Sequence, residues 1–427
     1  MSESIFFENA KIFQKPGSFY GQLPFFWLIL LWILSKIFSK NSFSKEISNS
    51  RWNVIDYCIT VLIFISAIGL IRVVIDYYPN MTEILKQFWV IVSLLFGYFI
   101  IKNWISSNKP EDVVNFLYCI VIINSIASFL FIVHQGLHFN IYTGEEYMSE
   151  SFQGEEITRS FWFMPQFLFF SISFLLVFTK RYSFVSIGLL LVNLLAIVIT
   201  YTISFVIIAI IILVLYFILM GLKEGKLLSA VKNLMIYAVM GILGVFIMSK
   251  LLPANTNYLM SRISEHTESQ YTMREPNDMD VRFTNTAIMI SKIDRDKKLL
   301  GMGPVTKFQS PKVLEMQANT ADMAWSGVIF YWGFIGLSLF LLIYIFSSFQ
   351  AFSFFMKSDG IISDLSLMLL IYIIAQFIEC FVSWTFLSGH GYTIGLWHFG
   401  VLSSLSVLNK TNRSVVGNDI YAPIYSR

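Results

Sequence analysis

Long apolar segments recur along most of this 427-residue chain, and each has the length that a membrane crossing requires. A transmembrane helix needs about 20 consecutive, mainly apolar residues. Only 13% of the residues are charged, whereas soluble domains carry about 25%. A single buried core does not account for that deficit in a chain of this size. We therefore expect lipid to be the solvent for much of the surface.

The segments predict an all-α fold, a polytopic transmembrane helix bundle of about 11 (11–12) spans. The run from 183 to 220 is nearly uncharged and too long for one span, so we divide it at residues 200–202. We expect three regions: an N-terminal membrane bundle (1–252), an outer loop (253–322), and a C-terminal membrane segment with a short cytoplasmic tail (323–427). The expected spans lie near residues 20–38, 54–75, 86–105, 113–133, 163–179, 183–200, 203–221, 232–252, 323–349, 362–387 and 391–408.

Basic residues fall on alternate loops, which predicts the orientation of the bundle. Loop 134–162 has five glutamates against Arg159 alone, and loop 253–322 has nine basic and nine acidic residues. The loops between them are rich in lysine and arginine, and the positive-inside rule places those in the cytoplasm. The N-terminus then lies outside, or residues 4–20 form a re-entrant or interfacial helix. The basic positions on the cytoplasmic side include Lys36, Lys40, Lys45, Arg51, Lys102, Lys109, Lys180, Arg181, Lys223, Lys226, Lys232 and Lys357.

The outer loop is the one long polar stretch, and it predicts a helix of its own. Asp278 or Asp280 is a suitable N-terminal residue for the sequence VRFTNTAIMISKI. Phe283, Ala287 and Ile290 fall on one face at helical spacing. We expect an amphipathic helix whose apolar face lies on the bundle. A charged run, DRDKK, and a turn, LLGMGP, follow it.

This arrangement resembles the shared domain of the O-antigen ligases and Wzy-type polysaccharide polymerases. The resemblance rests on the helix with Arg282, the LLGMG turn, Asn319 and the span that opens GVIFYWGFIGLSLF, and it covers roughly residues 160–350. Arg159, shortly before a span, matches a second arginine of the family. Two positions depart from the pattern. Val305 replaces a third glycine, and Ala318 stands where ligases carry a histidine, which favours the polymerase branch over a ligase.

The resemblance implies a membrane glycosyltransferase of O-antigen or capsule, and thus of lipopolysaccharide or polysaccharide, biosynthesis. Its donor and acceptor would be undecaprenyl-pyrophosphate-linked glycans, in the bacterial inner membrane with the active site facing the periplasm. The family also suggests a chain-length regulator as partner. Arg282 and Arg159 would grip the pyrophosphate, for which guanidinium supplies forked donors. The alternative for both is an interfacial arginine that snorkels to the membrane surface.

The last two expected spans carry a second pair of candidates, Glu379 and His398. Counted from Gly389 between the spans, both lie at similar depth below the outer rim. Ionisable residues inside spans are functional candidates, and Glu379 is a candidate general base for an acceptor hydroxyl. The alternative is a structural hydrogen bond between helices.

Further candidates for substrate binding are His390 at the rim, Asn319 and Trp325. A rim histidine is also compatible with simple solvation, and tryptophans serve as interface anchors. The three cysteines lie in apolar segments and no metal-ligand spacing occurs, so neither disulfide, metal nor cofactor is expected. The net charge of +3 does not indicate a nucleic-acid partner. A non-catalytic transporter or flippase for lipid-linked glycan remains a third hypothesis, although no internal repeat is evident.

Overall fold

The structure is a computed structural model. It describes residues 52–77, 81–136, 147–152, 155–160, 165–200, 202–228, 278–304, 324–382 and 396–406, with isolated positions between 231 and 264 and at 408. The expected span 20–38, most of 232–252 and the N-terminal tail lie outside the described residues. The same holds for Asn319 and His390.

The described residues are mostly helical, as predicted, and five helices are long and apolar enough to cross a membrane. Expected spans 54–75, 86–105, 113–133, 203–221 and 362–387 each correspond to one helix, whereas the total of 11 spans stays a prediction. The last helical stretch covers residues 397–406. The elements are α4 (Val54–Tyr77), α5 (Met81–Ser106), α6 (Pro110–Gly136), β1 (Tyr147–Phe152), β2 (Glu155–Ser160), α7 (Pro165–Ile199), α8 (Ile203–Glu224), α11 (Asp278–Lys292), the 3-10 helix η2 (Arg295–Lys297), α13 (Ala324–Lys357) and α14 (Gly360–Val382).

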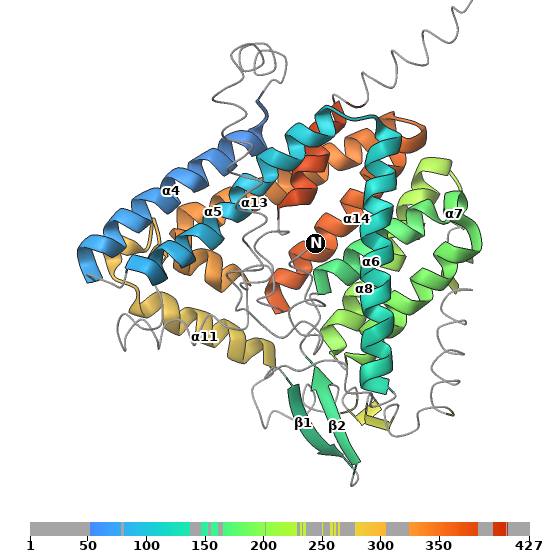
Figure 1. The fold of residues 1–427 in the computed structure, drawn as a ribbon, viewed down its shortest axis with the longest axis horizontal. Coiled ribbons are helices and arrows are strands. Elements are labelled where there is room, and N and C mark those ends of the chain that lie inside the picture. The colour runs from blue at the N-terminus through green and yellow to red at the C-terminus, as the bar shows by residue number, and fades with distance from the viewer. Residues whose placement is uncertain are drawn as a thin grey trace, which may run out of the picture.

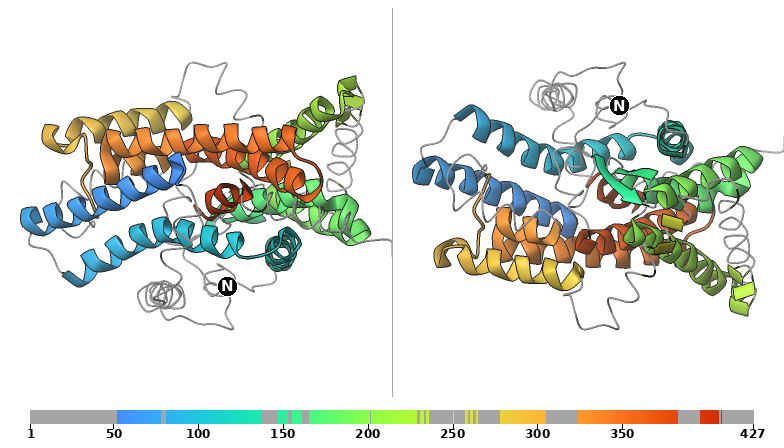
Figure 2. Two further views of the ribbon diagram at one scale, coloured as in Figure 1. Left: turned by 90° about the horizontal axis from the view of Figure 1, so that it is seen from above. Right: turned by 90° about the horizontal axis from the view of Figure 1, so that it is seen from below.

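Helix α14 is the centre of the bundle and packs against α13, α7 and α8 (Figure 1). The two views of Figure 2 show α4 between α13 and α5, with α11 on the other side of α13. Most of the residues along α14 are buried, and they include nearly every residue from Ile362 to Ile373. A helix that is apolar all round and buried on most sides is expected at the core of a membrane bundle.

Helix α7 folds back on itself between two apolar halves, Phe167–Thr179 and Phe184–Ile199. Asn124 and Ser125 are neighbours on α6, yet Asn124 Nδ2 donates to Ser171 Oγ (3.4 Å) and Ser125 Oγ accepts from Asn193 Nδ2 (2.7 Å). Ser171 and Asn193 would lie about 33 Å apart on a straight helix. The two halves of α7 therefore pack on the same part of α6, in agreement with the division expected between 163–179 and 183–200, whereas their crossing of a membrane stays a prediction.

A β-hairpin lies within the loop 134–162, for which the sequence indicated no strands. Strands β1 and β2 pair antiparallel, with Tyr147 opposite Ser160 and Met148 opposite Arg159. The hairpin lies at the lower edge of Figure 1, beside the end of α6. Nothing in the hydropathy of the loop 134–162 distinguishes paired strands from coil, because hydropathy reports burial and these residues project from the bundle.

Helix α13 extends beyond the expected span 323–349 and is broken at Gly333, whose φ of 66° and ψ of −164° are not helical. A break removes intrahelical partners from the carbonyls before it. Here the N–H groups of Met302 and Gly303 donate to the carbonyls of Phe330 (2.7 Å) and Tyr331 (3.2 Å). We call residues 298–304 the crossing segment, because they pass across the break.

The crossing segment also accepts hydrogen bonds from the far side of the break. The N–H of Phe334 donates to the carbonyl of Lys298 (3.0 Å), and that of Ile335 donates to the carbonyl of Leu299 (3.1 Å). Irregular backbone at membrane depth is tolerated only where protein satisfies its polar groups. The LLGMG turn therefore completes the helix that it crosses.

Glycine is required where the crossing segment touches its neighbours. A Cβ on Gly301 would lie 2.4 Å from the carbonyl oxygen of Tyr331, and one on Gly333 would lie 2.3 Å from that of Leu299. Both residues have positive φ, which costs any side chain further energy. The glycines of the turn are thus explained by a close approach of two backbones.

The two ends of the bundle differ in their polar contacts. At one end, Lys102 Nζ lies 2.6 Å from the buried Asp56 carboxylate, and Lys223 Nζ donates to the carbonyl of Ser358 (2.7 Å). We call this the lysine end. At the opposite end, the α11 end, Lys297 lies 2.6 Å from Asp76. The expectation that Lys102 and Lys223 share one side agrees with the structure.

Three glycine-to-alanine variants separate the cost of a steric clash at the crossing from the cost of a positive φ. Gly301→Ala introduces a clash and strain, and we expect it to lower the free energy of unfolding by roughly 3 kcal/mol or more. Gly225→Ala has positive φ but open space, so we expect a loss of about 1–2 kcal/mol. Gly188→Ala, in a helix with open space, should be neutral or stabilising by up to about 1 kcal/mol. Thermal unfolding of the purified protein in detergent measures all three. Equal stability of Gly301→Ala and Gly188→Ala would contradict the crossing.

Candidate functional site

The candidate site lies at the α11 end, where α11 is attached to the bundle by polar side chains. Arg282 Nη1 donates a hydrogen bond to the carbonyl of Val382, the last residue of α14. This bond joins α11 to α14 through a charged donor. One turn further along α11, the hydroxyls of Thr286 and Ser326 lie 2.5 Å apart. The predicted arginine is therefore held at the junction of α11, α13 and α14.

The buried face of α11 is not the one that the sequence predicted. The apolar face was expected to lie on the bundle, yet Phe283 is 50% exposed and Ala287 is exposed as well. The buried side instead carries Met289 and Ile293, in line with Arg282. The prediction holds for Ile290, which packs partly against the core, and is wrong for Phe283 and Ala287. Periodicity weighs apolar burial alone, whereas here hydrogen bonds of Arg282 and Thr286 set which side faces the protein.

A row of polar residues runs along α14 inside the bundle. Tyr372, Gln376 and Glu379 are spaced i, i+4 and i+7, which places them on one face of the helix, and each is at most 1% exposed. We call these three residues the polar stripe. Tyr344 Oη donates to Gln376 Oε1 (3.0 Å), and the Glu379 carboxylate interacts electrostatically with the hydroxyls of Tyr372 and Tyr344.

The sequence identified Glu379 but missed Tyr372 and Gln376, although their spacing within an apolar span was available as a signal. Glu379 lies three residues before Val382, about 4.5 Å along the helix axis. The Arg282 guanidinium and the Glu379 carboxyl group are therefore placed at the same end of α14, one helical turn apart. Of the three predicted catalytic residues, these are the two whose relative positions the structure describes.

His398 does not share the depth of Glu379, contrary to prediction. Its ring packs on Tyr372 with centroids 4.9 Å apart. Tyr372 is seven residues from Glu379, so His398 lies about 10 Å nearer to the lysine end. The count from Gly389 assumed that the last helix begins soon after that residue. In the structure Leu396 precedes the helix and His398 is its second residue.

Trp325 forms a buried aromatic wall beside the stripe. Its ring centroid lies 5.6 Å from that of Tyr344, 5.4 Å from Phe377 and 5.9 Å from Phe381. Its Nε1–H has no hydrogen-bond partner among the residues described. A tryptophan that anchors a protein at the membrane interface presents its indole N–H to water. Trp325 is buried, so it does not fit that role.

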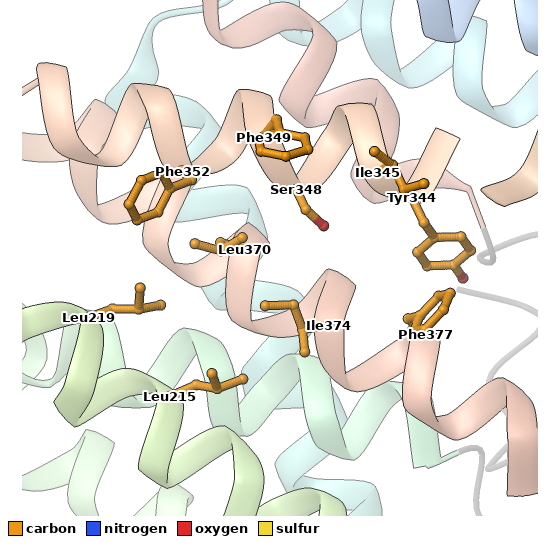
Figure 3. Close-up of a pocket in the computed structure, with 10 residues that line it drawn as sticks. All are labelled: Leu215, Leu219, Tyr344, Ile345, Ser348, Phe349, Phe352, Leu370, Ile374 and Phe377. Atoms are coloured by element: carbon orange, nitrogen blue, oxygen red, sulfur yellow. The ribbon is translucent and has the colours of Figure 1, made fainter. Parts of the chain in front are cut away.

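An apolar pocket adjoins this wall through Tyr344 and Phe377 (Figure 3). It has a volume of about 410 Å³ and lies between α8, α13 and α14. Tyr344 and Phe377 close the end nearest to Trp325, while Leu215 and Leu219 line the side formed by α8. Phe349 on its rim is 71% exposed. The pocket therefore reaches from an exposed side of the bundle to Tyr344, which donates to Gln376 of the polar stripe.

The structure describes no side chain for three further predicted residues. Arg159 lies on β2, and the structure describes its backbone only. Asn319 and His390 belong to stretches that are not described. Cys58, Cys119 and Cys380 are free thiols, and the described residues contain no group of three or more His, Cys, Asp and Glu side chains suited to a metal.

Fold and site together indicate a helical membrane protein that carries a buried carboxyl group beneath an arginine at one end of its central helix. A scan against protein-family models finds no match to the chain, and a search of curated proteins finds no similar sequence.

Truncation of Trp325 tests the aromatic wall. Trp325→Phe keeps most of the ring contacts and removes an N–H that has no partner in the described residues, so we expect little change in stability. Trp325→Ala should lower the free energy of unfolding by about 3–5 kcal/mol, because it leaves a cavity. Thermal unfolding in detergent is the measurement. An equally large loss for Trp325→Phe would show that the indole N–H has a structural partner.

Proposed function

We propose that the chain is a membrane glycosyltransferase that polymerises undecaprenyl-pyrophosphate-linked oligosaccharide repeat units of O-antigen or capsule, on the outer side of the bacterial inner membrane. The observation that carries the proposal is the placement of Arg282 and Glu379 one turn apart at the α11 end. The sequence resemblance to Wzy-type polymerases supplies the substrate class. Of the other residues in the family pattern, Arg159 is a second candidate for the pyrophosphate.

The reaction needs a cation at the leaving group. The acceptor hydroxyl oxygen attacks the anomeric carbon of the donor, and the bond from that carbon to undecaprenyl pyrophosphate breaks. Negative charge develops on the departing pyrophosphate, and a fixed guanidinium stabilises it in a site that excludes water. Arg282 is held for this role through its bond to Val382, which fixes the guanidinium before substrate arrives.

The reaction also needs a base, and Glu379 is a buried carboxyl group near this end. It takes the proton that the acceptor hydroxyl loses, while the electron pair of that oxygen forms the new glycosidic bond. A base must lie within hydrogen-bonding distance of the proton it removes. Burial between Tyr344 and Tyr372 keeps water away from the carboxylate.

The carrier chain of such a substrate is a long hydrocarbon, and the apolar pocket of Figure 3 suits it. The pocket opens between α8 and α13 and ends at Tyr344 and Phe377, which pack on Trp325. A polyprenyl chain in the pocket would extend its pyrophosphate toward the α11 end.

The positive-inside rule places the lysine end in the cytoplasm and the α11 end outside. Lys102, Lys223 and Lys357 lie toward the former. The donor arrives on the outer leaflet under this orientation, where Arg282 and Glu379 lie. A chain-length regulator would act from the same side.

The purified protein should form polymer from undecaprenyl-pyrophosphate-linked repeat units without any other enzyme. Glu379→Gln should lower kcat by about 10²–10⁴, the range that general-base catalysis contributes. Cys380→Ser is the matched control, since Cys380 is the next residue on α14 and equally buried, and it should retain near-wild-type activity. Polymer length on gels and initial rates are the readouts. Equal, near-wild-type activity in both variants would remove Glu379 from the mechanism.

A ligase is the nearest alternative, and a deletion strain separates the two. Loss of a polymerase leaves single repeat units on the lipid A core or surface. Loss of a ligase leaves polymer on the carrier lipid and none on the core. Ala318, at the position where ligases carry a histidine, favours the first result.

One observation favours the alternative that the protein is a transporter or flippase for lipid-linked glycan. Buried polar groups occur at both ends of the bundle, with Asp56, Lys102 and Tyr98 at the lysine end and the polar stripe toward the other. A charge-lined path is typical of transporters. Translocation of labelled lipid-linked repeat units across liposomes, without polymer formation, would establish that function and exclude the polymerase.

A further inference from the structure

Tyr372 and His398 carry buried polar atoms for which the described residues offer no hydrogen-bond partner. These atoms are Tyr372 Oη and both ring nitrogens of His398. Tyr372 is 1% and His398 0% exposed, and their ring centroids are 4.9 Å apart in an edge-on arrangement. Tyr372 lies ten residues before the end of α14, so the pair is about 15 Å below the α11 end. It occupies the middle of the bundle.

The rings packed against the pair are aromatic, and the described residues supply no hydrogen-bond partner to it. Phe170 lies 5.7 Å from Tyr372, and Phe399 lies 4.0 Å from His398, as ring centroids. A buried donor or acceptor without a partner costs stability, more so where no water is near. Phenylalanine at both positions would fill similar space without that cost, so packing does not explain a phenol and an imidazole here.

A neighbouring tyrosine shows what a purely structural role looks like. Tyr344 is as buried as Tyr372, but its hydroxyl donates to Gln376 Oε1 at 3.0 Å. The two tyrosines lie on adjoining helices around the same polar stripe. They differ in whether the described protein satisfies their hydroxyl groups.

We propose that Tyr372 and His398 form a binding subsite for one hydroxyl group. A neutral imidazole offers one donor and one acceptor, and a phenol offers a donor and an acceptor of its own. A hydroxyl oxygen that accepts one bond and donates another is complementary to them. The subsite therefore selects a group that both donates and accepts, rather than an anion or a cation.

Two sources can supply that hydroxyl. The first is a water molecule resident in the protein, since buried waters typically make about three hydrogen bonds to such groups. The second is a hydroxyl of the saccharide, and only this source rests on the proposed function. Resident water stabilises the protein before substrate binds, whereas a saccharide hydroxyl acts when the acceptor is present.

Radiolytic hydroxyl-radical labelling of the purified wild-type protein tests the first source. Side chains next to a bound water are oxidised although they are buried. We expect Tyr372 and His398 to be oxidised faster than Tyr344, which is the internal control of equal burial. This measurement requires no substrate and no activity.

Kinetics of Tyr372→Phe and His398→Phe test the second source, with Tyr98→Phe, equally buried but at the lysine end, as the matched control. If the subsite takes a saccharide hydroxyl, Tyr372→Phe raises KM for the lipid-linked acceptor by about tenfold, equal to about 1.4 kcal/mol for one lost hydrogen bond. Tyr98→Phe leaves KM unchanged and lowers the unfolding temperature, because Asp56 and Ser403 each lose a hydrogen bond with the phenol.

Faster labelling of the pair supports a resident water, and a raised KM with slow labelling supports the saccharide. Slow labelling together with a wild-type KM in Tyr372→Phe overturns the subsite. If the wild-type protein makes no polymer, the proposed function fails separately. The labelling result then decides alone, and labelling no faster than that of Tyr344 refutes the subsite.

Discussion

The exchange of backbone hydrogen bonds at Gly333 is the constraint on which the arrangement of the α11 end depends. A helix broken inside a membrane leaves donors and acceptors that lipid does not satisfy. The crossing segment supplies two N–H groups and two carbonyls to the broken ends of α13. Because these partners are backbone atoms, their geometry is fixed, and it requires glycine at 301 and 333.

The crossing segment also positions the helix that precedes it. Residues 295–297 join α11 to the crossing, and Lys297 binds Asp76 at the end of α4. Nearer its other end, α11 is held by two of its own side chains. Arg282 donates to Val382 of α14, and Thr286 contacts Ser326 of α13. An arginine on a surface loop would sample many positions. Here two attachments, one at each end of α11, hold the guanidinium above Glu379.

Hydropathy and charge predicted the helices well because lipid imposes one requirement on every span. The split of 183–220, the fold-back of α7 and the grouping of Lys102 with Lys223 all follow from length and charge.

The details of the site do not follow from length and charge. The break at Gly333 depends on a partner segment thirty residues away, the buried face of α11 depends on hydrogen bonds, and the depth of His398 depends on where the last helix begins. Each depends on contacts between residues that are far apart in the sequence, which the local residue pattern does not reveal. Arg282 and Glu379 were predicted as residues, whereas Tyr372 and Gln376 emerged from their position on the same face of α14.

The central claim is that a diphosphate binds at Arg282 with the reacting sugar beside Glu379. A cryo-electron microscopy structure of the protein with an undecaprenyl-pyrophosphate-linked repeat unit tests it most directly. We expect the pyrophosphate within hydrogen-bonding distance of the Arg282 guanidinium, the first sugar next to Glu379 and the carrier chain between α8 and α13. Density for the pyrophosphate at the lysine end, or away from Arg282, would contradict the claim.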